Sequence, residues 1–509
     1  MTLQPPPGSP TPPIALSGDP GAVTGRLTAP IVLMDNAFLE RLSEACPDVS
    51  LDPSECAEAS RDWWPLAMVW ATQGQVGQVA GVLARPATPA EVSAVLRLCH
   101  EARIPVTPAA GRSSVVGGTV PVHGGVLLDL TSLSGIVSVD ATSGMVEVMA
   151  GTFGDALEAE LSASHGLTVG HWPQSMSLST VGGWVACRGA GQLSNRYGKI
   201  EDIVVGLEVV LADGRVIRTG GQPREAVGPD LTRLFVGAEG TLGVITRAWL
   251  QAWPTPEAQG RSAWSFESFS AALEAMRRIT RRGAAPAVLR LYDGVESERN
   301  FATFGVDRSA NVLLAYDEGD PVMVEATMSV VTAECTTAGA ARLDDGLVER
   351  WFSHRNEVSA LEEFISKGFV VDTLEVSAPW SALDRIYTET VKAMSEVPGS
   401  ILVSAHQSHS YPTGACLYFT FGGMVDADQR DAYYTAVWDA GTRSVLANGG
   451  SLSHHHGIGL NRARFVPEAL KGGFGVLTSV KAALDPNGVC NPGKLGLPDN
   501  FGGPGWPTP

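Results

Sequence analysis

The apolar positions in the first half of the chain follow helical and strand spacing in turn. Val92, Val95 and Leu96 lie at helical spacing behind a threonine and a proline, so this pattern predicts a helix that begins near Pro89. The next stretch, IPVTP, has the pattern of a short strand and runs into a loop of small residues.

The same alternation continues toward residue 253. The stretch MVEVM predicts a strand, and GDALEAEL after it predicts a helix with Thr152 as its cap. VVGLEVV and VIRTG predict a hairpin that turns at Asp213 and Gly214. Strands that alternate with helices in this way indicate an α/β or α+β domain.

The pattern changes after the stretch WPTPE. Longer helical stretches such as SFSAALEAMRRITRR then alternate with strands such as NVLLAYD, which indicates a second domain of mixed type. Both ends of the chain are rich in proline and glycine and are predicted to be flexible. The predicted organisation is a disordered tail (1–30), an N-terminal helical segment (31–75), a first domain (76–255), a second domain (256–450), a C-terminal return (451–497) and a flexible tail (498–509).

Composition narrows the class of protein. A chain of 509 residues is too long for one simple core, and its 44% hydrophobic and 18% charged residues are typical of a globular protein. The net charge of −18 argues against nucleic acid as a partner. Seven scattered cysteines without a CxxC pair, and a first stretch unlike a signal peptide, predict a cytoplasmic protein. No apolar run predicts a transmembrane helix, but a peripheral membrane contact stays possible.

Four stretches are unusually rich in glycine and small polar residues: PAAGRSS, QSMSLSTVGGWVACRGAG, YGKIEDIV and EGTLGVIT. Glycine lets a backbone approach a ligand closely, and consecutive N–H groups can bind a pyrophosphate. Each stretch alone could be a tight turn, but four in one domain favour a nucleotide site. No GxGxxG follows a strand and no GxxxxGK[ST] occurs, so the sequence indicates a dinucleotide fold other than the Rossmann fold or the P-loop.

Together with GPDLTRLFVGAEG and the terminal DPNGVCNPGKL, these stretches resemble the FAD-linked oxidases of the vanillyl-alcohol oxidase and p-cresol methylhydroxylase superfamily. The resemblance implies an α+β fold, in which a PCMH-type FAD-binding domain of two subdomains carries a cap domain on a large antiparallel sheet. It also implies FAD as the cofactor. We expect the FAD to be non-covalent, because residues 109–118 lack the histidine that attaches the flavin in some members.

The resemblance assigns the FAD contacts to small and polar residues in these stretches. They are Pro108, Ala109, Ala110, Gly111, Arg112, Ser113 and Ser114; Gln174, Ser175, Met176, Ser177, Leu178, Ser179 and Thr180; Cys187, Arg188, Gly189 and Ala190; and Glu239, Gly240, Thr241, Leu242, Gly243, Val244 and Ile245.

Two branches of the superfamily compete for this chain. The stretches SLSHHHGIG, SAPW, YPTGACLYFTF and RLYD resemble the alkylglycerone-phosphate synthases, which implies catalytic roles for Tyr418, Arg290 and the histidines His454, His455 and His456. In that branch, an acylated dihydroxyacetone-phosphate-like substrate exchanges its acyl group for a long-chain alcohol through a flavin adduct.

The stretches GIGLNRARF and NPGKL resemble equally the D-2-hydroxyacid dehydrogenases of the glycolate and D-lactate type. In WFSHRNEV, Arg355 resembles the substrate arginine of that branch. The alternative function is therefore FAD-linked oxidation of a D-2-hydroxy acid or another alcohol. A flavin-binding protein without catalysis is a third possibility.

The run His454–His456 could be a metal site, an exposed tract or a set of proton carriers. Neighbouring side chains on an extended chain point to opposite sides. The metal-using hydroxyacid dehydrogenases have HxGDGNLH and a glutamate, where this chain has HSYPTGACLY from His409 and has His455. No metal site is therefore predicted.

We expect these histidines to bind and transfer protons above the flavin, because imidazole exchanges protons near neutral pH. Tyr418 would need such a basic neighbour to act as a base. Arg290 ends an apolar run and is expected to face an anionic ligand. The expected partner is a small-molecule or lipid-like substrate, and the protein is expected to be a homodimer.

Overall fold

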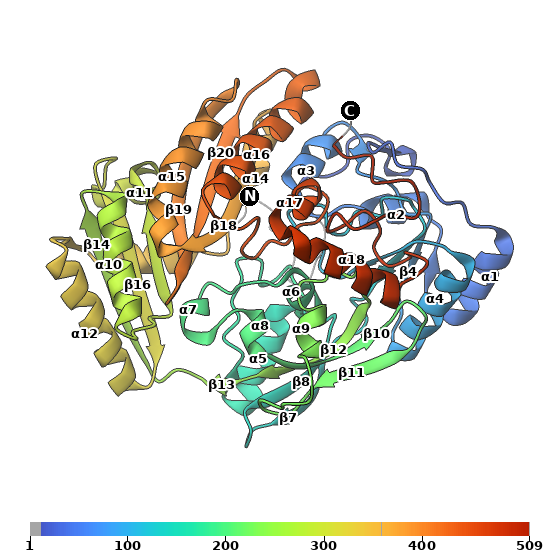
Figure 1. Cartoon of the computed structure of the whole chain (residues 1–509), viewed down its shortest axis with the longest axis horizontal. Helices are drawn as coiled ribbons and strands as arrows, with labels where there is room; N and C mark the ends of the chain where they lie inside the picture. Colours follow the sequence, from blue (N-terminus) through green and yellow to red (C-terminus); the bar gives the residue numbers. More distant parts are fainter. Residues whose placement is uncertain (1–11, 358, 508–509) are drawn as a thin grey trace.

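The computed structural model describes residues 12–357 and 359–507. Two units are visible in Figure 1: a body (residues 12–254 and 451–507) and a cap (residues 255–450). The chain enters the cap once and returns once, so the C-terminal residues lie on the body again.

The first half of the body is a four-stranded sheet behind an N-terminal helical segment. Its strands β4, β6 and β5 run parallel, and β2 pairs antiparallel at one edge. Their order in the sheet is β2 (Val49–Ser50), β4 (Val82–Ala84), β6 (Val126–Asp129) and β5 (Val106–Ala109). The helices are α1 (Asn36–Ala45), α2 (Pro53–Ala59), α3 (Pro65–Ala71) and α4 (Pro89–Ala102).

The second half of the body is a five-stranded antiparallel sheet. Its order is β11 (Val216–Gly220), β10 (Val204–Val210), β12 (Val244–Gln251), β8 (Met145–Met149) and β7 (Ile136–Asp140). Around it lie α5 (Gly154–His165), α6 (Val181–Cys187), α7 (Ser194–Tyr197), α8 (Ile200–Ile203) and α9 (Leu231–Phe235), with a small ladder of β9 (Leu167–Thr168) and β13 (Trp253–Pro254).

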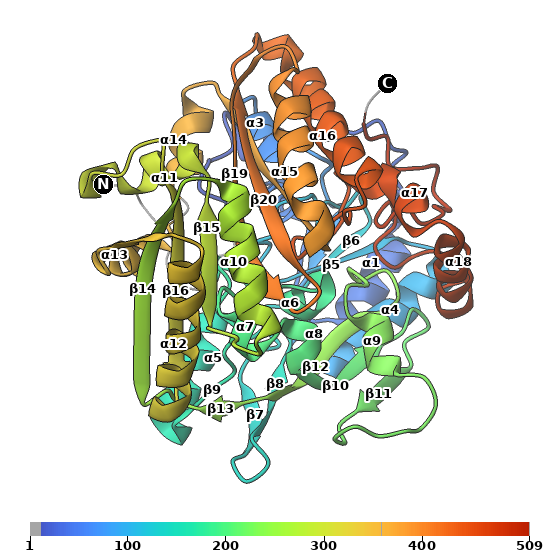
Figure 2. The same cartoon turned by 60° about the vertical axis from the view of Figure 1, so that its left-hand side comes forward.

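The cap is built on a seven-stranded antiparallel sheet. Its order is β17 (Ala341–Leu343), β14 (Ala258–Phe266), β16 (Asn311–Gly319), β15 (Val288–Tyr292), β19 (Ser400–Tyr411), β20 (Gly414–Gly423) and β18 (Val370–Pro379). Four long helices lie side by side along it (Figure 2): α10 (Phe269–Arg281), α12 (Pro321–Thr337), α15 (Trp380–Ser395) and α16 (Arg430–Ala447). Shorter ones are α11 (Gly294–Phe301), η2 (Ala302–Phe304), α13 (Gly346–His354), α14 (Ser359–Ser366) and η3 (Ala427–Gln429).

The body and the cap each combine helices with β-sheets, which confirms the predicted α+β class. The large antiparallel sheet lies in the cap, as predicted. The local predictions also hold at several points. Thr88 caps α4 by accepting the N–H of Glu91, and β10 and β11 form the predicted hairpin. The cap of α5 was predicted wrongly: Phe153 holds that position, because the Thr152 hydroxyl instead donates to the carbonyl of Met149.

The N-terminal tail differs from the prediction over its described part. Residues 20–25 form η1 (Pro20–Ala22) and β1 (Thr24–Gly25), and β1 pairs in parallel with β3 (Gln75–Val76). The apolar side chains of Ile14, Leu16 and Leu27 are buried. Residues 12–30 are therefore part of the packed body, because these apolar side chains outweigh the tail's proline-rich composition; residues 1–11 lie outside the described residues.

The C-terminal return runs through η4 (Ala463–Phe465), α17 (Val466–Leu470) and α18 (Gly472–Leu484), and then bridges to β5 at Cys490. The described end of the chain is not the flexible tail that we predicted. The ring of Trp506 lies edge-on to Trp64 and Trp70, at centroid distances of 5.2 and 5.5 Å. This aromatic cluster continues into the cap, where the Trp64 indole donates to the Tyr434 hydroxyl at 2.8 Å.

We predict that Trp506→Ala destabilises the protein by about 3 kcal/mol, the usual cost of removing a buried aromatic ring. Thermal unfolding should show a lower Tm. Val227→Ala is the control, because Val227 is 83% exposed and its loss should leave the Tm unchanged. An unchanged Tm for Trp506→Ala would show that the C-terminal residues do not contribute to the core.

Candidate functional site

One large cavity of about 1220 Å³ lies between the body and the cap. This volume exceeds the roughly 300–1,000 Å³ of an ordinary small-molecule pocket, so it has room for a dinucleotide and a substrate together. Three of the four glycine-rich stretches of the body line one part of it, and β15, β18, β19 and β20 of the cap line another. The fourth stretch, YGKIEDIV, does not line the cavity, because it forms the short helix α8 and the start of β10, whose apolar side chains belong to the core.

Most of the residues predicted to bind FAD line this cavity. They include all of Pro108–Ser114, and also Gln174, Ser175, Leu178, Ser179, Thr180, Cys187, Gly189, Ala190, Glu239, Gly240, Gly243, Val244 and Ile245. Five predicted residues do not line it: Met176, Ser177, Arg188, Thr241 and Leu242.

The reasons for three of these exceptions are visible in their contacts. Met176 and Leu242 belong to the apolar core of the five-stranded sheet. Arg188 is 58% exposed at its side chain and pairs with Glu201 at 3.1 Å. The resemblance assigned whole stretches to the FAD site, so it could not distinguish the residues that line the cavity from their neighbours that face the core or the solvent.

The body side of the cavity fits a polar cofactor such as FAD. Several buried polar atoms there have no hydrogen-bond partner among the described residues: Nε of Arg112, Oγ1 of Thr119, Oδ1 of Asn491 and both ring nitrogens of His171. Buried polar groups are normally satisfied, so unpaired ones that line a cavity indicate a polar ligand. The glycines on this side let segments of the body pack closely, since a Cβ at Gly111 would clash with the carbonyl of Leu178 and a Cβ at Gly240 with the ring of Pro108.

His171 is a cavity residue that the sequence did not reveal. It is fully buried, and its ring lies 4.5 Å from the ring of Trp184. Burial and the nearby charge of Lys199 lower the pKa of His171 to about 3, so its imidazole is neutral at physiological pH. In the sequence, the only sign that His171 lines the cavity is its place just before the QSMSLS stretch.

The histidine run is held in place by Glu375, a fully buried residue of β18. Its carboxylate accepts the backbone N–H groups of His455 and His456 at 3.0 and 2.6 Å. It also pairs at 2.7 Å with the guanidinium of Arg462, which is equally buried. The cap therefore fixes the C-terminal loop through one carboxylate.

Tyr418, for which the resemblance implied a catalytic role, lies on β20 and lines the cavity. Its hydroxyl is 3.3 Å from Nε2 of His456 and receives a hydrogen bond from Thr373 at 3.2 Å. Burial raises the pKa of Tyr418 above its usual value, whereas burial lowers the pKa of His456 to about 4. The pair is therefore a neutral phenol beside a neutral imidazole, within hydrogen-bond distance of each other.

Arg290 also lines the cavity, on β15. Its guanidinium donates to the Tyr292 hydroxyl and to Nε2 of His406, both at 2.7 Å. His406 in turn faces the buried carboxylate of Glu296 through Nδ1, at 2.9 Å. This chain fixes the arginine above the cavity with one charge available for an anion.

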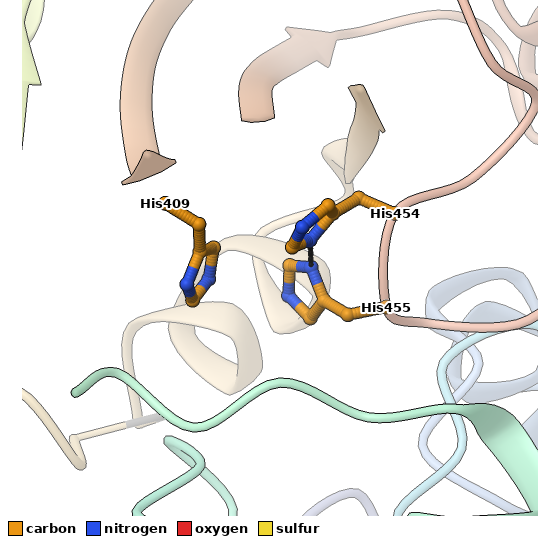
Figure 3. Close-up of side chains that lie close together, drawn as sticks. All are labelled: His409, His454 and His455. Carbon is orange, nitrogen blue, oxygen red and sulfur yellow. Dashed lines mark hydrogen bonds between the residues drawn. The ribbon is translucent and has the colours of Figure 1, made fainter. Parts of the chain in front are cut away.

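The rings of His409, His454 and His455 lie close together (Figure 3), and one nitrogen from each lies within 4.8 Å of the others. A bulge in β19 between Gln407 and His409 shifts the register by one residue. That shift moves His409 to the sheet face that carries Tyr418. His455 and His456 line the cavity, whereas His454 lies behind them.

This group is a poor metal site in the present arrangement. A metal ion must lie in the plane of each imidazole that binds it, but the rings of His409 and His454 are stacked, with planes only 23° apart. Nδ1 of His454 and Nδ1 of His455 are 2.8 Å apart, as in a direct hydrogen bond. The geometry favours a hydrogen-bonded network, and the absence of a metal site stays a prediction.

The cap end of the cavity combines positive charge with apolar surface. Arg355 stacks on the Phe352 ring at 4.6 Å, and its Nη1 is buried without a partner among the described residues. Three arginines that the sequence did not distinguish from ordinary helix surface also line this end: Arg299, Arg308 and Arg350. The apolar lining is made by Leu361, Phe364, Phe369, Val371, Ile401 and Leu402.

Across the described residues, no helix is both long and apolar enough to span a bilayer.

Two family models match this chain. The family described as "FAD binding domain" matches residues 80–220, and "FAD linked oxidases, C-terminal domain" matches residues 255–495. An uncharacterised FAD-linked oxidoreductase of Escherichia coli, YgcU, is 32% identical over 421 residues, which cover 80% of this chain and 86% of that protein.

Two other relatives are named for different reactions. An alkyldihydroxyacetonephosphate synthase of Trypanosoma brucei brucei is 29% identical over 79% of this chain and 70% of its own length. The glycolate oxidase subunit GlcD of Bacillus subtilis is 29% identical over 80% of this chain and 86% of its own length.

Two solved structures share the fold. An alkyldihydroxyacetonephosphate synthase has a TM-score of 0.78 at 23% identity, with 95% of this chain and 90% of that chain covered. p-Cresol methylhydroxylase has a TM-score of 0.73 at 16% identity, with 91% and 96% covered.

We predict that Glu375 makes the stability of the protein depend on pH. Burial opposes its ionisation, but Arg462, His456 and the backbone N–H groups outweigh burial and lower its pKa from 4.5 to about 2. A lowered pKa stabilises the fold at pH values above 4.5, and this contribution of about 3 kcal/mol is lost as the pH falls from 4.5 toward 2.

Glu375→Gln should therefore lower the Tm at pH 7, because it leaves Arg462 without its carboxylate partner. The difference in Tm between the variant and the wild type should become smaller as the pH approaches 3, because Glu375 of the wild type then becomes protonated and loses the same ion pair. Glu349→Gln removes an exposed ion pair with Arg261 and serves as the control. Parallel Tm-against-pH curves for wild type and Glu375→Gln would contradict this role.

Proposed function

Because the chain belongs to the FAD-linked oxidase family, we propose that this FAD-dependent enzyme replaces the acyl group of a phosphate-bearing, lipid-like substrate by a long-chain alcohol. FAD, when bound, supplies the reactive centre for this exchange. The residues of the chain bind the two substrates, hold them away from water and move the protons.

One observation carries the proposal: a single cavity offers both an arginine-rich surface and an apolar wall. Guanidinium groups match phosphate and carboxylate oxygens, and Arg290, Arg350 and Arg355 line the cavity. The apolar wall around Phe364 and Leu402 suits a long alkyl chain. A two- or three-carbon hydroxy acid would leave that wall without a partner.

The proton chemistry is assigned to Tyr418 and His456. The hydroxyl of Tyr418 lies within reach of the cavity, and Nε2 of His456 is 3.3 Å behind it. We propose that this pair accepts the proton of the incoming alcohol. Arg290 holds the anionic group, and the glycine-rich stretches of the body hold the cofactor.

Oxidation of a D-2-hydroxy acid or another alcohol is the second candidate. It is favoured by the similarity to YgcU, named as an oxidoreductase, and to a glycolate oxidase subunit. Both candidates use the same cavity and the same Tyr418–His456 pair. The homodimer and the cytoplasmic location remain predictions.

The two reactions can be separated under anaerobic conditions. We expect an acylated dihydroxyacetone phosphate and a labelled long-chain alcohol to yield labelled ether product without bleaching of the flavin. Tyr418→Phe should lower that rate by roughly 10²- to 10⁴-fold, because a positioned acid–base group is lost, and should keep its FAD. Bleaching by glycolate or D-lactate, with no ether product, would replace the first candidate by the second.

FAD should be bound without a covalent link. The loop 109–118 has no histidine, and the only cysteine that lines the cavity among the described residues is Cys187. Burial raises the pKa of the Cys187 thiol to about 12, so it is a poor nucleophile. Acid precipitation should release the yellow colour into the supernatant. A yellow pellet that survives washing would demonstrate a covalent bond.

A further inference from the structure

Tyr411, the last residue of β19, lies on the far side of the histidine group from the cavity. Its hydroxyl is 2.7 Å from Nε2 of His454. Nδ1 of His454 is 2.8 Å from Nδ1 of His455, and His455 lines the cavity. From this unbroken line of contacts, we propose that Tyr411, His454 and His455 form a proton relay between the cavity and the turn after β19.

The contact between the two histidines has only two arrangements when both rings are neutral. Either Nδ1–H of His455 donates to Nδ1 of His454, or the reverse, because a hydrogen bond between two nitrogens holds one proton. In the first arrangement the single N–H of His454 is at Nε2 and points to Tyr411, and Nε2 of His455 carries no proton and can accept one. In the second, Nε2 of His455 carries a proton and can donate it.

Conversion of the first arrangement into the second carries one proton outward. Nε2 of His455 takes a proton from the cavity, and its Nδ1 proton passes to Nδ1 of His454. The Nε2 proton of His454 passes to the oxygen of Tyr411, which releases its own hydroxyl proton to the surface. Each group ends neutral with as many protons as before, and the reverse sequence carries a proton inward.

The outer end of the relay reaches the surface. Tyr411 is partly exposed, and the turn residues that follow it, Pro412 and Thr413, are exposed. Burial is the main cause of the raised pKa of its hydroxyl, and the charges of Glu201 and Asp202 also raise it. Glu201 pairs at 3.1 Å with Arg188, whose side chain is 58% exposed. The line of contacts therefore leads from the cavity toward this exposed turn.

The inner end is open to the cavity. Among the described residues, Nε2 of His455 has no hydrogen-bond partner, and its ring points into the space shared with His409 (Figure 3). Ser194 lies beside this line of contacts, and its hydroxyl is 2.7 Å from Nδ1 of His409.

The surroundings keep the two rings neutral, which this mechanism requires. The Nζ of Lys199 donates to the carbonyl of His454 at 2.6 Å and places a positive charge beside the rings. Glu375, the nearest carboxylate of the cap, is occupied by backbone N–H groups and Arg462. Burial, the neighbouring imidazoles and Lys199 hold the pKa of His454 and His455 well below the usual value.

The relay does not depend on which of the two candidate reactions occurs. Acyl-to-alkyl exchange forms a carboxylic acid, which loses its proton at pH 7, and oxidation of an alcohol removes its hydroxyl proton. In both cases a proton must leave the cavity. Tyr411 does not line that cavity, so it acts through the histidines and not on the substrate.

The first test is Tyr411→Phe, which removes only the hydroxyl. With whichever substrate the wild type converts, kcat at low buffer concentration should fall roughly 10- to 100-fold, near the lower end of what one proton carrier contributes. Added imidazole should restore turnover in the variant and leave the wild type unchanged. Tyr433→Phe, which loses a hydroxyl near Ser400 in the cap, should match the wild type. Wild-type turnover in Tyr411→Phe, or a loss that imidazole does not restore, would overturn the relay.

A second test needs no substrate, so it is independent of the proposed function. In ¹⁵N-histidine spectra of the FAD-loaded wild type, the ring nitrogens of His454 should average between protonated and unprotonated shifts, because the two arrangements interconvert. In Tyr411→Phe, one tautomer should be fixed. A fixed tautomer in the wild type would overturn the proposal. So would stoichiometric zinc or nickel that His409→Ala removes, because a ligated nitrogen cannot carry a proton.

Discussion

The buried ion pair between Glu375 and Arg462 is the contact on which the arrangement of the cavity depends. Glu375 belongs to a cap strand and Arg462 to the C-terminal return, and both are fully enclosed. An enclosed pair adds little net stability by itself, but the loss of either partner leaves an uncompensated charge and is costly. The pair therefore specifies position: it fixes the histidine loop to β18, and so fixes the loop relative to Tyr418 on the neighbouring strand.

Strand geometry explains why the chemistry gathers on one face of the cap sheet. Along β20, Leu417 and Phe419 pack into the core under the long helices, so Tyr418 between them faces the cavity. On β19, regular alternation would bring Ser408 opposite Cys416. The bulge places His409 there instead. One extra residue in a strand thus completes the histidine group.

The sequence predicted those parts of the fold and site that local patterns control. Helical stripes, the Asp213-Gly214 turn and the glycine-rich stretches act over a few residues, and each appears where it was expected except YGKIEDIV, which does not line the cavity. Contacts between distant segments could not be foreseen. Nothing in the sequence pairs Trp506 with Trp64, or Glu375 with Arg462, because hundreds or dozens of residues separate the partners and only the fold brings them together. The position of the arginines that line the cap end of the cavity could not be predicted either, since the sequence around them has an ordinary charged pattern.

The charges inside the cavity differ from those of the acidic chain as a whole, because the cavity residues are largely buried. The chain carries a net charge of −18, yet the cavity presents several guanidinium groups and a set of neutral imidazoles. Burial accounts for both features. It makes a fixed cation such as Arg290 a strong attraction for an anion, because little water screens it. It also holds the histidine rings uncharged, so that they exchange protons without adding repulsion between cations in one small space. Permanent charge for binding and neutral rings for proton movement therefore coexist within one cavity.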